Sequence, residues 1–258
     1  MKTTRRLRSG SFARQLGIGL LSLATSTLAA QPARAPVKIA ILDFGVNALL
    51  MSEAERQSVR DYGPAFAEVL TAVWQAAGDT LLVERRRLDA VLAERQLQAE
   101  QFGGDQAAAQ LGRLLGASHI LFGGVQFERG REHLNVIVTS RLVETSTGKL
   151  VGGRVLRGRE FDLLDDLTDR LSDSIRVMLR LPQLRREPAA TPSDARRRYT
   201  DDEYRRASAA LAAPLQFERR GERAEAAALW EQIAADSRTP DRVRAAARQR
   251  ARGGESGG

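Results

Sequence analysis

Apolar positions follow two periods along the chain, and both predict regular structure between residues 37 and 180. Residues 37–44, Val-Lys-Ile-Ala-Ile-Leu-Asp-Phe, form a short apolar run rich in β-branched residues, which is typical of a buried strand. Residues 45–60 show little periodicity and predict a loop that enters a helix. From Pro64 to Gly78 the spacing is helical, because one face gathers the apolar residues Phe66, Leu70, Val73, Trp74 and Ala77.

A second strand and two shorter helices are expected next. Residues 80–83 predict the strand, and the helix after it places Leu88, Val91 and Leu92 on one side. Asp105 is the expected N-cap of the following helix, which ends at Gly116. The small residue Gly112 would allow this helix to approach the sheet closely. The side chains expected to face inward are Ala108, Leu111, Leu114 and Leu115.

The period then changes to two, which predicts an antiparallel part of the sheet. A strand is expected over 120–127, and residues 133–143 alternate between apolar and polar side chains, as a strand with one solvated face does. Gly148 closes a turn that leads into a partner strand over 150–161. A helix over 163–180 is then expected to bury one stripe of apolar side chains, formed by Leu164, Leu167, Leu171, Ile175 and Met178.

The predicted order is β-α-β-α-α-β-β-β-α, which indicates an α/β domain with one mixed sheet and packed helices over residues 36–182. Residues 183–198 are expected to be a linker and 253–258 a disordered tail. Between them, 199–252 predicts a small all-α extension that begins with a helical hairpin broken at Gly221 and resembles part of a tetratricopeptide repeat. One repeat cannot bury its own apolar face. We therefore expect a partner or a second copy to cover the stripe formed by Ala226, Trp230 and Ile233, in preference to the α/β domain.

The first 30 residues have the three parts of a secretory signal peptide. A basic start without acidic residues is followed by a short apolar run over 16–24 and by small residues, so cleavage is expected after Ala29 or Ala30. The apolar run is shorter than the roughly 20 residues of a spanning helix. Because no cysteine follows it, no lipid attachment is expected. The mature protein is predicted to be soluble and periplasmic; Sec or twin-arginine export, and peripheral association with the outer membrane, remain open.

Charge and composition argue against several classes of function. The net charge of +8 lies mostly in residues 1–35, with six basic and no acidic side chains, whereas residues 36–180 carry 18 basic and 20 acidic ones. A nucleic-acid-binding domain needs a basic patch on the folded part, so no nucleic-acid partner is expected. With no cysteine and two histidines, His119 and His133, no metal site is expected either.

No catalytic or cofactor-binding residue is predicted. The chain has no G-x-S-x-G, H-E-x-x-H or P-loop sequence, and Thr147-Gly-Lys149 lacks the upstream glycine of a P-loop. Asp43, at the end of the first strand, is the one carboxylate worth inspecting, although a cap or turn role is favoured for it. Asp165 and Asp166 are expected on the solvated side of their helix.

Four segments resemble the CsgG-like family of the curli secretion channel. In chain order they are 38–44, 83–94, 111–124 and 141–149, which together cover roughly residues 37–180. The resemblance implies a CsgG-like α/β domain. TolB N-terminal-like domains and the lipoprotein activators of penicillin-binding proteins share this style of fold and are the nearest alternatives.

The resemblance implies an assembly, scaffold or transport-accessory protein that binds other envelope proteins without catalysis. The alternative is a regulator of a penicillin-binding, cell-wall enzyme, and a homo-oligomer remains open. Channel-forming members carry a lipid anchor and long inserted hairpins, whereas only residues 128–131 separate two strands at the usual insertion point here. The chain therefore resembles the soluble part of such a channel, and no pore is expected.

Overall fold

The computed structural model describes residues 36–94, 104–131, 133–184 and 199–255. The predicted signal peptide, residues 256–258 and most of the predicted linker lie outside these ranges. The predicted disordered tail, 253–258, begins too early, because residues 253–255 continue the last helix. Within them, no helix is long and apolar enough to cross a bilayer.

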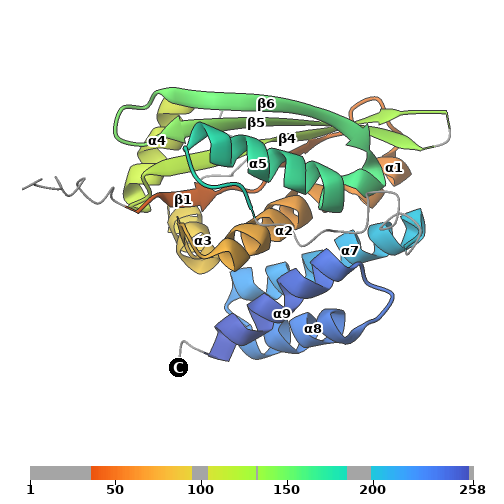
Figure 1. The fold of residues 1–258 in the computed structure, drawn as a ribbon. Coiled ribbons are helices and arrows are strands. Elements are labelled where there is room, and N and C mark those ends of the chain that lie inside the picture. The colour runs from red at the N-terminus through yellow and green to blue at the C-terminus, as the bar shows by residue number, and fades with distance from the viewer. Residues whose placement is uncertain (1–35, 95–103, 132, 185–198, 256–258) are drawn as a thin grey trace, which may run out of the picture. The chain divides into compact units, whose positions relative to one another are not determined.

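One mixed sheet organises the α/β part of the chain (Figure 1). Its strand order is β3-β1-β4-β5-β6, with β1 parallel to both β3 and β4, and with β5 antiparallel to both β4 and β6. The strands are β1 (Lys38–Ile41), β3 (Leu81–Leu82), β4 (His119–Arg129), β5 (Leu134–Glu144) and β6 (Leu150–Arg159). The predicted fold class is confirmed, including the alternation along β5, where Val136, Val138 and Leu142 are fully buried.

The segment expected to be a loop contains two short elements. Strand β2 (Gly45–Asn47) pairs in parallel with residues 124–126 of β4, and helix α1 (Glu53–Val59) follows it. β4 is longer than β1, which pairs with it only as far as Leu121. The chain leaves β4 at Asp43 and pairs with it again at Gly124. Strand β2 therefore forms because β4 extends beyond β1 and offers backbone groups to pair with, not because β2 has an apolar period of its own.

Helices cover both faces of the sheet, and the sheet separates two buried apolar clusters. α2 (Tyr62–Ala77) and α5 (Thr168–Met178) pack against the face that carries Ile39, Leu121 and Val138. α3 (Arg85–Glu94) and α4 (Asp105–Leu114) pack against the other face, which carries Ala40, Leu42 and Ile120. A 3-10 turn (Glu160–Asp162) and a π turn (Leu163–Leu167) precede α5, so the helix predicted from residue 163 is α-helical only from Thr168.

Two predictions for α4 were wrong. Leu114 is 45% exposed, because Ala108, Leu111 and Leu115 already complete an inner stripe at helical spacing and Leu114 lies beside it. Gly104, not Asp105, is the N-cap; Asp105 is the first helical residue, and its carboxylate accepts hydrogen bonds of 2.7 and 2.8 Å from the Arg141 guanidinium.

Gly112 permits the close approach of α4 to the sheet that the sequence predicts. A Cβ atom at this position would lie 2.2 Å from Cγ2 of Thr145, which is far inside van der Waals contact. Gly116 and Gly148, with φ of 63° and 70°, adopt the left-handed conformation that favours glycine. These three glycines therefore serve the fold.

Three helices form the C-terminal part: α7 (Asp201–Arg220), α8 (Arg223–Ala235) and α9 (Asp241–Glu255). Trp230 is 1% exposed and belongs to the same buried cluster as side chains of α2, and its Nε1 donates a 2.8 Å hydrogen bond to Oε1 of Glu218. The expectation that a partner covers this stripe was wrong, because the chain's own residues bury it. A likeness of α7 and α8 to a tetratricopeptide repeat stays a prediction.

Arginines of α9 pair with carboxylates of the α/β part. Arg250 donates bonds of 2.6 and 2.8 Å to Glu68 of α2, which is 3% exposed. Arg242 reaches both Asp165 and Asp169 at 2.6 Å. The prediction that Asp165 lies on a solvated face was therefore wrong, because α9 packs there and pairs with it. Burial raises the pKa of Asp165, while Arg242 opposes that rise.

Candidate interaction surface

The connection between β2 and α1 presents two leucines to solvent. Leu49 is 79% exposed and Leu50 is 92% exposed, the highest values among the large apolar side chains of the described residues. Single exposed apolar residues are ordinary on protein surfaces, whereas adjacent ones on a fixed element indicate a contact surface. We call residues 47–52, which carry this pair, the leucine turn.

Hydrogen bonds fix the shape of the leucine turn. The Met51 amide donates to the Ala48 carbonyl at 3.0 Å, so Leu49 and Leu50 occupy the two central positions. Asn47 Oδ1 accepts from the Leu49 amide at 3.3 Å, while Ala48 and Met51 are buried and anchor both sides. Glycine, proline, asparagine and aspartate favour such central positions for conformational reasons that leucine does not share. Turn chemistry therefore does not explain the pair.

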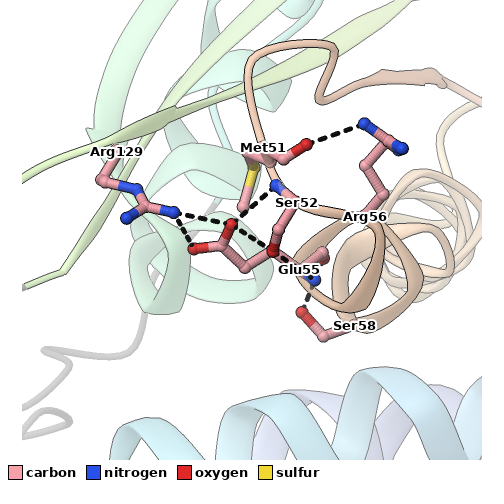
Figure 2. A network of polar contacts seen from close by, with 6 residues as sticks. All are labelled: Met51, Ser52, Glu55, Arg56, Ser58 and Arg129. Carbon is pink, nitrogen blue, oxygen red and sulfur yellow. Dashed lines mark hydrogen bonds and ion pairs between the residues drawn. The ribbon is translucent and has the colours of Figure 1, made fainter.

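A capping box holds the far side of the leucine turn (Figure 2). Oε2 of Glu55 accepts from the Ser52 amide at 2.8 Å and from its hydroxyl at 2.7 Å, and Ser52 Oγ accepts from the Glu55 amide at 3.4 Å. These bonds, first of all those from Ser52 and then that from Arg129, lower the pKa of Glu55 below its ordinary value of 4.5.

Two arginines extend this network in opposite directions. Arg129, the last residue of β4, donates from Nη2 to both carboxylate oxygens of Glu55, at 2.7 and 2.8 Å, and so connects α1 to the β4–β5 hairpin. Arg56 donates from Nη1 to the Met51 carbonyl at 2.7 Å and from Nε to Glu53 at 3.2 Å. Figure 2 shows Arg129 against the carboxylate of Glu55 and Arg56 against the carbonyl of Met51. The leucine turn is thus braced from the sheet and from its own helix.

A hollow of about 450 Å³ lies beside the leucine turn. Its lining combines apolar residues, one amide and two arginines: Val46, Asn47, Ala48, Leu49, Arg56 and Arg60. Residues 45–61 together with Arg129 carry three carboxylates and three guanidinium groups. This balance gives no strong field for a polyanion, so the surface favours apolar contact with a polar rim, as protein interfaces do.

The residues that the sequence offered as candidates for chemistry lie at strand ends and turns. Asp43 is half-buried between β1 and β2. His119 Nδ1 lies 3.0 Å from Ser118 Oγ, which also donates to the Lys38 carbonyl at 2.8 Å and so joins β1 to β4. Lys149 follows the turn at Gly148. Among the described residues, no group of three or more histidines and carboxylates has the arrangement to hold a metal ion.

The sequence analysis did not predict the leucine turn, although one of the two features that fix it is visible in the local sequence. Ser52 and Glu55 have the spacing of a capping box, which marks a helix start within the segment assigned to a loop. The contact between Glu55 and Arg129 spans 74 residues of chain and follows only from the pairing of β2 with β4.

Comparisons with known proteins give one family match and several similar solved structures. The model of the family described as "Curli production assembly/transport component CsgG" matches residues 21–134. This range includes three of the four segments of resemblance and ends before the fourth, at 141–149. No curated protein sequence matches the chain.

Solved structures with a similar fold come from several bacteria. The C-terminal domain of LpoB from Salmonella enterica is 14% identical, with 50% of this chain and 87% of that one covered and a TM-score of 0.32. Lipoprotein GNA1162 from Neisseria meningitidis is 12% identical, with 56% and 99% covered and a TM-score of 0.36. The PelC dodecamer from Paraburkholderia phytofirmans is 17% identical, with 57% and 90% covered and a TM-score of 0.34.

Proposed function

We propose that this chain, which contains a CsgG-like domain at residues 21–134, is a non-catalytic accessory protein of the bacterial envelope. It would act in the periplasm by binding another envelope protein, and the leucine turn would make the contact. The single observation that carries this proposal is the pair Leu49 and Leu50, held outward on a turn that its own hydrogen bonds and Arg56 of α1 fix.

A rigid turn loses less conformational entropy than a flexible loop when it binds a partner. A flexible loop loses conformational entropy when a partner orders it, at about 1–2 kcal/mol per residue, whereas a turn already fixed by hydrogen bonds has lost most of that freedom on folding. Burial of a leucine side chain in a partner contributes about 1.5–3 kcal/mol. Two leucines presented in this way therefore suit the centre of an interface.

The predicted leader and the match to a family model support the location. The leader at residues 1–30 has the organisation of a secretory signal, and the matching family is described as an assembly or transport component. A scaffold or transport-accessory role accounts for both facts without requiring an active site.

Crosslinking in intact cells tests the proposal. The wild-type chain should yield a reproducible envelope-protein adduct, and the double variant Leu49→Ser with Leu50→Ser should lose it. The matched control is Leu114→Ser, which alters an exposed leucine of α4 and should leave the adduct unchanged. All three proteins should melt at similar temperatures, because the changed side chains are largely in solvent.

The identity of the adduct decides the kind of accessory role. A penicillin-binding enzyme would make the chain a regulator of cell-wall synthesis, and a secretion component would make it an assembly protein. Equal adducts from the wild type and the double serine variant would contradict a contact through the leucine turn.

A further inference from the structure

Strand β6 forms one edge of the sheet in the described part of the chain, with β5 as its partner (Figure 1). A sheet edge exposes backbone N–H and C=O groups that another chain can pair with, and proteins usually block such edges with proline, bulges or covering elements. β6 contains no proline, and its register irregularity lies at its start, opposite Leu142 and Val143.

Two side-chain contacts identify the backbone groups that point outward. Nη1 of Arg170 donates to the Arg157 carbonyl at 3.4 Å, and the Arg159 amide donates to Oδ2 of Asp162 at 2.9 Å. The N–H and C=O of one strand residue point to the same side, and the side alternates along the strand. Gly153 and Val155 therefore direct their backbone groups away from β5, as Arg157 and Arg159 do.

The same contacts divide the edge into a closed half and an open half. Arg170 and Asp162 cover the end at Arg157 and Arg159. Toward the other end, Val155 is 56% exposed and Gly153 is exposed, and glycine places no side chain beside the strand. The open half, residues 152–155, follows the register irregularity and has the length of a short added strand. We call it the open edge.

Charge determines which chain suits the open edge. β6 carries Arg154, Arg157 and Arg159 and no acidic residue, and Lys149 precedes it. Arg159 pairs with Asp162, which follows the strand. Pairing of two copies through β6 would still bring together Lys149, Arg154 and Arg157 of both strands, and facing like charges destabilise a sheet. An acidic segment would instead meet complementary charge.

We propose that the open edge binds an extended, acidic segment of a partner protein as an additional β-strand. Main-chain hydrogen bonds to Gly153 and Val155 supply the pairing, and the exposed cations Lys149, Arg154 and Arg157 select acidic side chains. This site is separate from the leucine turn and does not depend on it.

Fluorescence anisotropy with the full chain tests the proposal. The probe is a labelled short peptide of alternating glutamate and valine, and the comparison peptide has lysine at each glutamate position. Saturable binding of the acidic peptide, with binding of the lysine peptide weaker by at least about tenfold, is expected. Equal binding of the two peptides, or no binding of the acidic one, overturns the proposal.

A substitution at the edge tests the main-chain pairing. Val155→Pro removes an N–H that points outward, so the β5–β6 ladder keeps its bonds while an added strand loses one; binding should weaken by about tenfold. Val155→Thr keeps the N–H and should bind as the wild type does. The acidic peptide N-methylated at alternate residues should also bind poorly, and this test leaves the protein unaltered. Undiminished binding of the N-methylated peptide would show that pairing is not the mode of recognition.

Discussion

Glu55 connects three features of the surface around the leucine turn. Its carboxylate accepts hydrogen bonds from Ser52, the N-cap of α1, and from the guanidinium of Arg129 in the sheet. The next residue, Arg56, donates to the carbonyl of Met51. A small set of polar bonds therefore determines how Leu49 and Leu50 are presented. The capping box is readable from the sequence, whereas the partner at position 129 is not, because nothing near Glu55 in the chain specifies it.

The pKa of Glu55 should be measurably below 4.5, by NMR titration of its side-chain carboxyl. Ser52→Ala should raise this pKa toward the ordinary value, since Ser52 is the largest cause of the shift, and Arg129→Ala should raise it less. Ser58→Ala is the control, because Ser58 Oγ bonds the main-chain carbonyl of Glu55 and not its carboxylate. An unshifted pKa in the wild type would mean that the capping box does not persist in solution.

The sign of the effect on stability follows from the direction of the shift. A carboxyl group with a lowered pKa in the folded state stabilises that state above its unfolded pKa, and the stabilisation is lost as pH falls through the folded pKa. The Ser52→Ala protein should therefore lose less stability than the wild type does between about pH 5 and pH 3.

Truncation of two leucines of α4, Leu111 and Leu114, should have very different effects on stability. Leu111→Ala removes a buried side chain and should lower the free energy of unfolding by about 2–5 kcal/mol. Leu114→Ala changes a side chain that lies beside the buried stripe and should cost within about 0.5 kcal/mol. Denaturant melts compare the two; similar losses would place the wrong face of α4 against the sheet.

At the scale of elements, periodicity predicts what is long and local. The helices α2 and α5 and the strands β4, β5 and β6 each show their own apolar pattern, so their existence and order follow from the sequence. β2 and the packing of α9 on α2 do not, because three residues carry no period and because Arg250 meets Glu68 across 182 residues of chain. The buried position of Trp230 has the same cause: its cover comes from packing between elements.

Removal of the Arg250 guanidinium should destabilise the protein strongly. Arg250→Ala leaves the buried carboxylate of Glu68 without this partner, which typically costs about 3–5 kcal/mol. Arg248→Ala is the matched control, since Arg248 is exposed on the same helix and should have little effect. Adding Glu68→Gln to Arg250→Ala should recover part of the loss in thermal or denaturant unfolding. Equal stability of the Arg250→Ala and Arg248→Ala proteins would contradict the packing of α9 on α2.

At the scale of the molecule, the α/β part and three C-terminal helices share one buried cluster, and we propose two surfaces for partners. The leucine turn offers apolar side chains, and the open edge of β6 offers backbone groups beside arginines. The sequence predicts the fold, and the proposed class of function rests on the family resemblance. It does not predict either surface, because each arises where elements distant in the chain end beside one another.

Site-specific photocrosslinking in intact cells tests the central claim, contact through the leucine turn, most directly. A photoreactive amino acid at position 50 should give a discrete adduct with an envelope protein, and the same group at position 114 should give none of that adduct. The result that would contradict the account is an identical pattern of adducts from positions 50 and 114, or none from position 50 while a crosslinker elsewhere on the chain captures a partner.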